Sequence, residues 1–580
     1  MVAGSSRGSS VVDPKAAGGP IAIPAINLTL KVYANCDHTY LVWKASDHIA
    51  GCRGFAIYRR RDGEDELLDT YVGFAGETAA PGTLKPSNNW PVQKFMWSDY
   101  MVWPGDVVQY RVVPVAGPDK DHLVEQPGHA SEWSPAVSVT ADTDSSTQAY
   151  FNRGVVAAQW LARRLGRPED AANKLETIIA TPGDPTREEL GGELMSAMQV
   201  LLQEAAQGSN QLYCVLFELN DPDLLGRLLS IGERANVVLA NGSPQPPQTD
   251  ENKSARQALS AKGVRVYDRM VPKGSLAHNK FAVICNGQRE PLKAWSGSTN
   301  WTMTGLCTQS NNGIMFTNPE IARLYLDQWD RLKFAGNEFP PELVSANDTL
   351  KTAAYDDRKV SIWFTRVNDQ FDLVDAKKHI DEATQGILFL MFNPGPSGTL
   401  LNFIIERNDA TSPSYDPHLY THGVLNQDPS THKNPIHLFN RGQENRADFE
   451  IALPAAVTQQ LNYWRKELLK LPSAHALVHS KTIVIDAFGR KPVVMTGSHN
   501  MGPRASTVND DNLVIIENDP SLAEAYAVYI MGVFDQYWWR FRTNQSGQLQ
   551  WNGLVDNDAW QDSYLSGPRL HELKFWLGEE

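Results

Sequence analysis

The sequence predicts an α/β protein with an internal duplication, preceded by a small all-β sandwich domain. One short polar motif occurs twice, about 200 residues apart, and each copy leads into a β-prone run. Around these motifs the apolar runs are continuous, which is typical of strands in a sheet covered by helices on both faces. Before residue 143 the apolar runs are short and separated by turn residues, as in an all-β domain.

Residues 1–24 are rich in Gly, Ser, Ala and Pro, and we expect a flexible leader there. This segment lacks the apolar centre of a signal peptide. No apolar run in the sequence reaches the roughly 18 to 20 residues that a membrane-spanning helix needs. We therefore expect a protein without a transmembrane segment, which is either cytoplasmic or exported by a route without a cleavable signal.

Residues 25–142 are expected to form the small all-β domain, with Trp43 and Tyr110 in its core. The phrases at 105–112 (Gly-Asp-Val-Val-Gln-Tyr-Arg-Val) and 131–134 (Ser-Glu-Trp-Ser) resemble a fibronectin type III domain. That resemblance implies a separable spacer or binding module, joined to the rest by a linker at 143–150. The predicted strands are Leu28–Tyr33, Tyr40–Lys44, Gly54–Arg61, Val107–Val115 and Ala136–Thr140.

The composition is that of a folded, soluble protein. The chain has 580 residues, of which 42% are hydrophobic and 21% charged, and it is long enough for two or three domains. Its net charge of −14 weighs against a nonspecific nucleic-acid binder, because such proteins usually carry a basic surface. The five cysteines show no C-x-x-C spacing, so we expect no metal cluster, no cofactor and free thiols at Cys36 and Cys52. A monomer is favoured.

The duplicated motif places a histidine and a lysine two residues apart. The first copy is 278–280 (His-Asn-Lys) followed by 297–300 (Gly-Ser-Thr-Asn), and the second is 479–481 (His-Ser-Lys) followed by 497–500 (Gly-Ser-His-Asn). The histidines are 479 − 278 = 201 residues apart and the asparagines 500 − 300 = 200. Because strand side chains alternate with period two, each His and Lys point to one face. Together the copies offer two imidazoles, two ammonium groups and two amides, which suits a phosphodiester.

The duplication continues beyond the motifs. An apolar strand follows each copy, at 312–316 and at 512–516. Each strand is followed by an Asn-Pro or Asp-Pro pair, at 318–319 and 519–520, which is a typical start for a helix. Since both the polar motif and the helix start recur at nearly one offset, they indicate a repeated unit and not a coincidence.

The pattern H-x-K-x4-D followed by G-S-x-N resembles the phospholipase D superfamily, whose members join two such half-sites in one active site. The second copy is complete, with Asp486 at the motif aspartate, whereas the first has Cys285 there. The resemblance implies a duplicated α/β/α sandwich with a pseudo-twofold active site, formed by residues 151–345 and 346–580. It also implies metal-independent phosphoryl transfer through a phosphohistidine. Asp486 would end its strand about 16 Å from Lys481, so we expect it to support the fold and not to touch phosphorus.

Each motif residue receives a role from the chemistry of phosphodiester cleavage. A neutral imidazole attacks phosphorus, and an imidazolium on the opposite side protonates the leaving alkoxide. Ammonium and amide groups stabilise the charge that develops on the non-bridging oxygens, while the motif serines shape the turn. The predicted catalytic residues are His278, Lys280, Asn300, His479, Lys481 and Asn500, with Ser298 and Ser498 as turn residues.

Each histidine needs a partner on its second ring nitrogen, which fixes its tautomer and basicity. The family resemblance implies a carboxylate or amide just after the G-S-x-N strand, at Asn312 in the first copy and Asp511 in the second, with the preceding residue as an alternative in each. A carboxylate beside His479 would raise the pKa of that ring and keep it protonated. We therefore predict that His278, beside an uncharged amide, is the nucleophile and that His479 is the acid.

These observations favour a phospholipase D-type phosphodiesterase that hydrolyses phospholipid to phosphatidic acid and head group, or passes the phosphatidyl group to an alcohol. A metal-independent nuclease or nucleotide phosphodiesterase is the alternative, and a binding protein that has lost catalysis is the third. Three features favour a phospholipid substrate at a membrane or vesicle surface. They are the acidic net charge, the added β domain and the apolar run 389–392, which is expected at the mouth of the active site. Residues 393–433 are expected to form a loop over this mouth, with three surface histidines, His418, His422 and His432.

Overall fold

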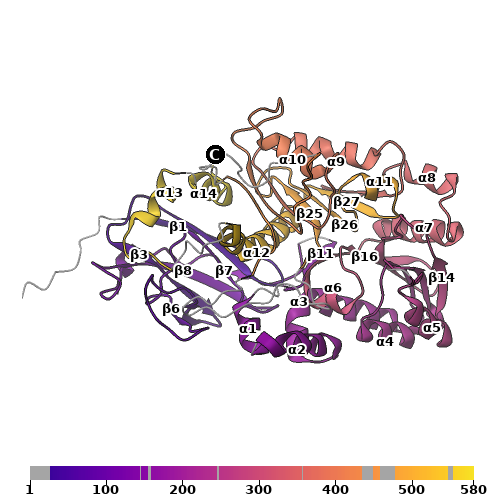
Figure 1. Cartoon of the computed structure of the whole chain (residues 1–580), viewed down its shortest axis with the longest axis horizontal. Coiled ribbons are helices and arrows are strands. Elements are labelled where there is room, and N and C mark those ends of the chain that lie inside the picture. Colours follow the sequence, from indigo (N-terminus) through magenta and orange to yellow (C-terminus); the bar gives the residue numbers. More distant parts are fainter. Residues whose placement is uncertain are drawn as a thin grey trace, which may run out of the picture.

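The computed structural model describes residues 26–143, 146–154, 158–166, 168–244, 247–355, 357–433, 448–456, 477–545, 553–567 and 569–579. The predicted leader at 1–24 lies outside these ranges. A β-rich region lies at one end of the molecule, and two sheets flanked by helices form the remainder (Figure 1).

The β-rich region holds two antiparallel sheets, in which Trp43 and Tyr110 are fully buried. The ring of Trp43 meets that of Phe55 edge-on, with 5.3 Å between their centroids. Four of the predicted strands lie within observed ones, and the fifth overlaps β10. One sheet has the order β1 (Leu28–Ala34), β2 (Thr39–Ala45), β7 (Met96–Asp99). The other has the order β10 (Val137–Ser138), β8 (Val107–Ala116), β3 (Cys52–Arg61), β4 (Glu64–Leu67), and β9 (Val124–Glu125) also pairs with β8. A separate two-stranded sheet is formed by β5 (Asp69–Thr70) and β6 (Lys85–Pro86).

The next sheet is built mainly from the first half of the duplicated region. Its order is β11 (Thr147–Phe151), β18 (Asn312–Phe316), β16 (Pro291–Gly297), β15 (Lys280–Cys285), β12 (Gln211–Leu216), β13 (Ala235–Ala240), β14 (Arg265–Arg269). The helices of this half are α1 (Gln159–Leu165), α2 (Pro168–Ala180), α3 (Pro185–Ala205), α4 (Pro222–Ile231), α5 (Lys253–Ala261), α6 (Met303–Cys307), α7 (Pro319–Ala335) and α8 (Pro341–Asn347). Asp184, Asp221 and Asn318 cap α3, α4 and α7, each directly before a proline at the first helical position.

The third sheet belongs to the second half. Its order is β19 (Lys351–Tyr355), β20 (Arg358–Phe364), β27 (Asn512–Glu517), β26 (Val493–Gly497), β25 (Lys481–Ile485), β21 (Gly386–Met391), β22 (Tyr420–Leu425), β23 (Phe449–Ala452). The helices here are α9 (Phe371–Asp381), α10 (Leu400–Asn408), α11 (Pro503–Thr507), α12 (Pro520–Gln545), α13 (Asp562–Leu565) and α14 (Leu570–Leu577).

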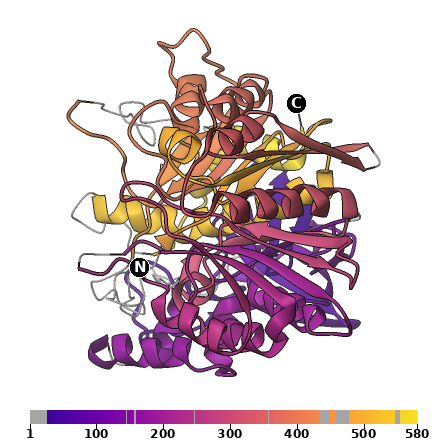
Figure 2. The same ribbon diagram turned by 90° about the vertical axis from the view of Figure 1, so that its right-hand side faces the viewer.

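The two large sheets share strand order and strand direction. The run β18-β16-β15-β12-β13-β14 corresponds to β27-β26-β25-β21-β22-β23, with antiparallel pairs up to β12 or β21 and parallel pairs beyond. Helices α7 and α12 lie between the sheets, where α7 packs on β15, β16 and β19, and α12 packs on β21 and β22 (Figure 2). Both motif strands, β15 and β25, therefore lie at the centre of their sheets.

Two predictions for connecting segments are wrong. Residues 147–150, expected to be linker, belong to β11, which pairs with β18 at the edge of the first sheet. The expected loop at 393–433 contains α10 and the buried strand β22, so His422 lies in the core and its Nδ1 bonds Tyr420 Oη at 2.7 Å. His418 and His432 are exposed, as expected.

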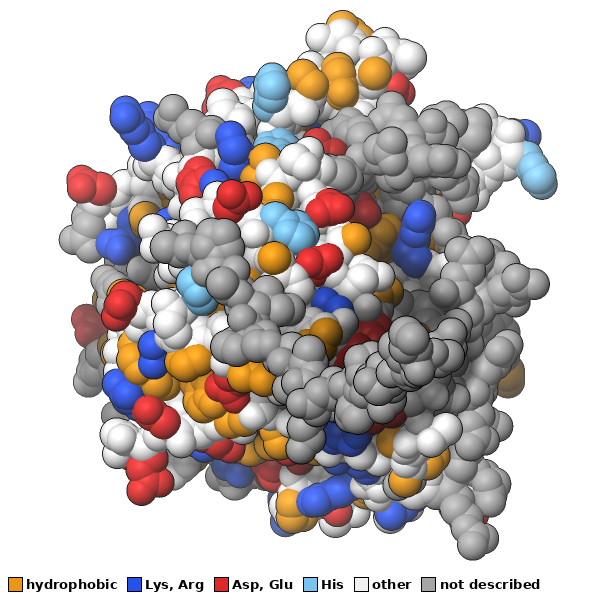
Figure 3. Space-filling model, turned by 90° about the vertical axis from the view of Figure 1, so that its left-hand side faces the viewer, with side chains coloured by type: hydrophobic (Ala, Val, Ile, Leu, Met, Phe, Trp, Pro, Cys, Tyr) orange, Lys and Arg blue, Asp and Glu red, His pale blue; other side chains and the backbone are white. Residues whose placement is uncertain are grey.

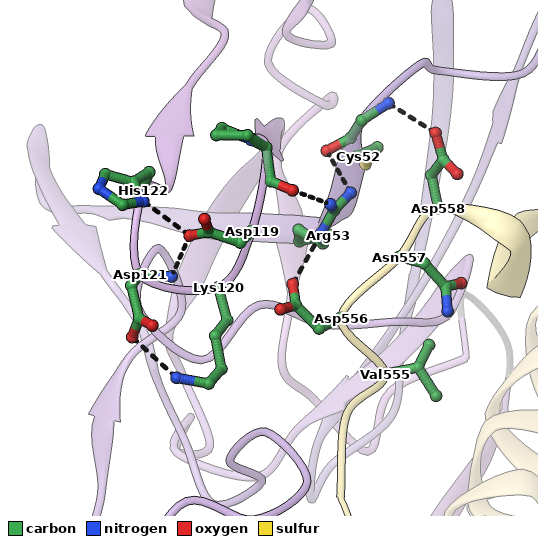
Figure 4. Close-up of polar contacts among 12 residues, drawn as sticks. Cys52, Arg53, Asp119, Lys120, Asp121, His122, Val555, Asp556, Asn557 and Asp558 are labelled. Carbon is green, nitrogen blue, oxygen red and sulfur yellow. Dashed lines mark hydrogen bonds and ion pairs between the residues drawn. The ribbon is translucent and has the colours of Figure 1, made fainter. Parts of the chain in front are cut away.

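The β-rich region shares a hydrophobic core with the second half of the chain, which contradicts the expected separable module. The ring of Trp576 on α14 lies 4.6 Å from that of Tyr40, and Trp560 lies 5.8 Å from Phe55. In Figure 4, residues 555–558 run beside the start of β3, where Arg53 Nε donates to Asp556 Oδ1 at 3.0 Å. Segments about 500 residues apart in the sequence thus pack as one unit.

Figure 3 shows the face of the molecule on the left of Figure 1. Acidic and basic side chains are interspersed there, so the negative net charge is not gathered on this face. Within the described residues, no helix combines the length and apolar composition needed to cross a bilayer.

Candidate active site

The two motif histidines lie where short segments of the two halves cross. On one side, Ala277 forms a β-bridge with Asp510, and the backbone N–H of His278 donates to the carbonyl of Asp510 at 2.8 Å. On the other side, β17 (Gln309–Ser310) pairs with β24 (Leu477–Val478), and the N–H of His479 donates to the carbonyl of Ser310 at 3.0 Å. The segment after each G-S-x-N strand therefore reaches across to the motif of the other half.

This crossing sets the partner of each imidazole. Nδ1 of His278 donates to Asp511 Oδ1 at 2.7 Å, and Nδ1 of His479 donates to Asn311 Oδ1 at 2.9 Å. The motif serines hold these partners, since Ser298 Oγ donates to Asn311 Oδ1 and Ser498 Oγ to Asp511 Oδ1, both at 2.8 Å. Both histidines consequently leave Nε2 for chemistry.

The prediction that each histidine bonds a partner from its own half is wrong. Asp511 contacts His278 and not His479, because the partner comes from the opposite half. The first half supplies Asn311, the alternative given above, which contacts His479, while the Asn312 amide donates to Thr496 Oγ1 at 2.6 Å. The 200-residue offset between the motif asparagines also links 311 with 511, and this signal was available in the sequence.

The lysines and two phenylalanines surround the histidines symmetrically. Each lysine Nζ donates to the carbonyl of the motif histidine two residues before it, at 2.7 Å for Lys280 and 2.5 Å for Lys481. Lys280 lies 4.8 Å above the ring of Phe217, and Lys481 lies 4.7 Å above that of Phe392. The same two rings contact His278 and His479, with centroid distances of 4.7 and 4.6 Å. The sequence placed the run that ends at Phe392 at the expected mouth of the site, whereas Phe217 was not assigned to the site.

Burial controls the protonation of these groups. Desolvation, followed by the charge of Lys280, lowers the pKa of His278 to about 4, against the opposing effect of Asp511. Desolvation and the two lysines lower the pKa of His479 well below its usual value. Although burial alone would raise it, the charge of His278 holds the pKa of Asp511 below its usual range. At neutral pH the resting site thus holds two neutral imidazoles, one of them bonded to a carboxylate.

The two motif asparagines differ in their surroundings. Asn300 Nδ2 donates to Glu218 Oε2 at 2.6 Å, so a carboxyl group that sequence reasoning missed stands beside the first amide. The amide oxygens of Asn300 and Asn500 are buried and have no hydrogen-bond partner within the described ranges. Both amides are thus only partly satisfied.

Residues 443–538 match the protein-family model described as "Cardiolipin synthase, PLD-like domain". This match covers 96 residues, about a sixth of the chain. The match spans His479, Lys481, Asn500 and Asp511, which are the predicted site residues of the second half.

Solved structures of low sequence identity are similar to the chain. One is phosphatidylserine synthase of Haemophilus influenzae Rd KW20, at 10% identity and a TM-score of 0.41, with 60% of this chain and 85% of that chain covered. Another is polyphosphate kinase from Porphyromonas gingivalis, at 13% identity and a TM-score of 0.35. The alignment covers 55% of this chain and only 42% of that chain. A third is the phospholipase D family member Nuc from Salmonella typhimurium, at 18% identity and a TM-score of 0.21, with 31% of this chain and 97% of that chain covered. No curated protein matches the sequence.

The motif aspartate of the second copy, Asp486, bonds backbone at the start of a neighbouring strand and does not bond either histidine. Its carboxylate accepts from the backbone N–H groups of Thr384, Gln385 and Gly386, at 2.7 to 3.1 Å, which fixes the start of β21. In the first half, Cys285 is buried and desolvation raises the pKa of its thiol to about 12. Asp486 therefore supports the fold through hydrogen bonds, and Cys285 supports it through packing.

In the part of the chain that the structure describes, no three His, Cys, Asp or Glu side chains are grouped as a metal site.

Proposed function

We propose that this protein is a phosphoryl-transfer enzyme of phospholipase D type, which cleaves a phospholipid to phosphatidic acid and a free head group. The observation that carries the proposal is the pair of buried histidines, each held at Nδ1 by the opposite half, with a lysine beside each. This arrangement presents two Nε2 atoms to one phosphodiester. The match of residues 443–538 to a PLD-like family model supports the same chemistry, and the description of that family names a phospholipid enzyme, which favours lipid over nucleic acid.

His278 is proposed as the nucleophile, on an argument different from the one drawn from the sequence. Its low pKa keeps the ring neutral at pH 7, so that Nε2 carries a lone pair. As the N–P bond forms the imidazole becomes cationic, and the carboxylate of Asp511 stabilises that charge through Nδ1. The P–O bond to the leaving group breaks on the opposite side, and the leaving oxygen takes a proton from His479.

His479 must gain a proton before it can act as an acid. In the empty site the neighbouring lysines disfavour its charged form. An anionic phosphodiester between Lys280 and Lys481 offsets that repulsion, so substrate binding raises the proton affinity of His479. In the second step His479 removes a proton from water, the new P–O bond forms and the N–P bond breaks. An alcohol in place of water would give transphosphatidylation.

The remaining groups hold the substrate. Desolvation lowers the pKa of Lys280 to about 7 and that of Lys481 well below its usual value, and an anion restores their charge. We propose that Lys280, Lys481, Asn300 and Asn500 contact the non-bridging oxygens, with no metal. Residues 25–142 are proposed as a fibronectin type III-like region, packed on the second half, that presents the enzyme to a vesicle surface. Of the run 389–392, residues 389–391 are buried in β21, and Phe392 lies against His479, so within this run Phe392 alone supplies apolar surface at the site.

The test measures release of choline and ethanolamine from phospholipid vesicles, beside cleavage of single- and double-stranded DNA. We expect head-group release by the wild type, and losses of about 10²-fold or more for His278→Ala and His479→Ala. His418→Ala, at an exposed histidine, is the matched control and should retain full activity. Cleavage of DNA without head-group release would replace the lipid proposal by the nuclease alternative.

Intermediate trapping tests the roles of the two histidines. With an activated diester, His479→Ala should accumulate phosphate on residue 278, as read by mass spectrometry of peptides, and His278→Ala should accumulate none. Phosphate found on His479 in the His278→Ala variant would reverse the assignment.

A further inference from the structure

The proposed phosphate site contains one carboxyl group that the two-histidine chemistry does not use, that of Glu218. Its backbone is held firmly at the end of β12. The carbonyl of Glu218 accepts from the N–H of Trp301 at 3.2 Å. The Asn252 side chain bonds the residues on either side, donating to the Phe217 carbonyl at 2.8 Å and accepting from the Leu219 N–H at 3.0 Å. The carboxyl group is therefore carried on a fixed stretch of backbone.

The side chain of Glu218 engages the amide of Asn300. An ionised carboxylate can only accept hydrogen bonds, so it selects the amide rotamer in which Nδ2 faces Glu218, at 2.6 Å. In this rotamer Asn300 Oδ1 is buried without a partner among the described residues, and the side chain is 5% exposed. A buried, unpaired amide oxygen is costly, so a rotated amide would remove a penalty. The rotated form requires a donor at Glu218.

We propose that Glu218 is a positioning residue whose protonation decides which end of the Asn300 amide faces the phosphate. When ionised, Glu218 accepts from Nδ2 and one of the two amide N–H bonds is used up. When protonated, it donates to Oδ1, the amide turns over, and Nδ2 is free to donate to a non-bridging oxygen. One proton is taken from solvent to form an O–H bond on the Glu218 carboxyl group, and no covalent bond between heavy atoms changes. This inference rests on the proposed function, since it requires a phosphodiester between the motifs.

The second half has no titratable residue at the position equivalent to Glu218. Leu216 pairs with Lys280 in the first sheet, and Met391 pairs with Lys481 in the second. Two residues beyond these positions, the first half has Glu218 and the second has Asn393, which does not titrate. The asymmetry makes one amide of the pseudo-twofold site dependent on pH and leaves the other independent of it.

The charged groups that face Glu218 determine where it titrates. Burial, followed by the charge of Glu251, raises the pKa of Glu218 to about 7, while Lys280 and Lys481 oppose the rise. An anion bound between the lysines repels the carboxylate and raises its proton affinity further, so anion binding takes up a proton. The affinity for a phosphodiester should consequently fall as pH rises above 7, by up to about tenfold per pH unit for one proton.

The experiment measures binding of dimethyl phosphate, whose single charge is constant between pH 5.5 and 8.5, to the full chain by ligand-observed NMR. For the wild type we expect the dissociation constant to rise above pH 7. Glu218→Gln should show a smaller rise over the same range, because a glutamine amide can donate to Asn300 Oδ1 at any pH and only the titration of the lysines and His479 remains. Glu251→Gln, at an exposed residue, is the matched control and should move the midpoint to lower pH without removing the transition. Thermal melts establish that each variant is folded.

Three results would overturn the inference. A transition in Glu218→Gln as large as that of the wild type would assign the titration to Lys280, while leaving the proposed function intact. An undiminished transition in Asn300→Ala would show that the charge of Glu218 acts directly and not through the amide. Wild-type protein that binds no dimethyl phosphate at any pH would overturn the inference and the proposed function together.

Discussion

Replacing Asp511 by asparagine removes the charge beside His278 while keeping the shape of the side chain. Asp511 Oδ1 accepts from Nδ1 of His278 at 2.7 Å, and both side chains are buried. Ser498 Oγ also donates to this oxygen, at 2.8 Å, and can donate equally to an asparagine oxygen. The variant would give His278 the kind of partner that His479 has in Asn311. The change therefore isolates the carboxylate charge.

The magnitude follows from the contact. A buried hydrogen bond to a charged group is worth about 1.5 to 3 kcal/mol, and about 1.4 kcal/mol corresponds to a tenfold change in rate. We therefore expect kcat of Asp511→Asn to fall about 10- to 150-fold. Because the lost charge stabilises the cationic phosphoimidazole and not the bound diester, KM should change only a few-fold.

The assay follows nitrophenolate release from bis(p-nitrophenyl) phosphate. The companion variant Asn311→Asp places a carboxylate beside His479, and the double variant exchanges the two partners. If His278 requires the carboxylate, the double variant stays as slow as Asp511→Asn. A double variant within about threefold of wild type would instead mean that the two histidines can exchange roles. Near-normal kcat in Asp511→Asn alone would refute the proposed role of the charge.

The remaining predictions concern stability, metals and truncation. Burial lowers the pKa of His278 to about 4, so the unfolded chain binds a proton there first as pH falls below its usual value of 6.5. The free energy of unfolding should therefore decrease between pH 6.5 and 4, and less so in His278→Gln, as measured by urea titration. Burial raises the pKa of Glu450 to about 8, so stability is lost as pH rises from 4.5 towards 8. Glu450→Gln should melt at a higher temperature than wild type at pH 8, and at a similar temperature at pH 4. Activity should survive EDTA, and complete loss restored by zinc or calcium would refute the metal-free chemistry. Deletion of residues 1–142 uncovers Trp560 and Trp576, so the shortened chain should bind a hydrophobic dye and melt earlier than the full chain. A shortened chain that melts like wild type would show the β-rich region to be separable after all.

The motif residues could be found from sequence because their signal is local. Strand periodicity places His278 and Lys280 on one face, and the duplicated spacing marks a second copy. The partner of each histidine could not be found in this way, because it depends on how the two halves cross. Glu218 belongs to no motif, and its only sequence signal is its position directly after an apolar strand.

The errors in the second half have a common physical cause. Residues 393–433 are rich in turn-forming residues, but a six-residue buried strand, β22, is hidden among them. His422 looked like a surface residue because histidine is polar, whereas the Tyr420 hydroxyl satisfies its ring inside the core. Tertiary contacts thus overrode local composition.

The packing of β1 against α14 also has a consequence for synthesis of the chain. Lys31 Nζ donates to the carbonyl of Leu577, and Tyr33 Oη to that of Trp576. A ribosome that adds about 5 to 20 residues per second needs roughly 20 to 90 s to proceed from the end of the β-rich region to these partners. During that interval the aromatic surface around Tyr33 and Tyr40 has nothing to cover it, and it is a natural binding site for a chaperone. Arrested nascent chains that end before residue 553 should therefore be captured by chaperones more strongly than released, complete protein.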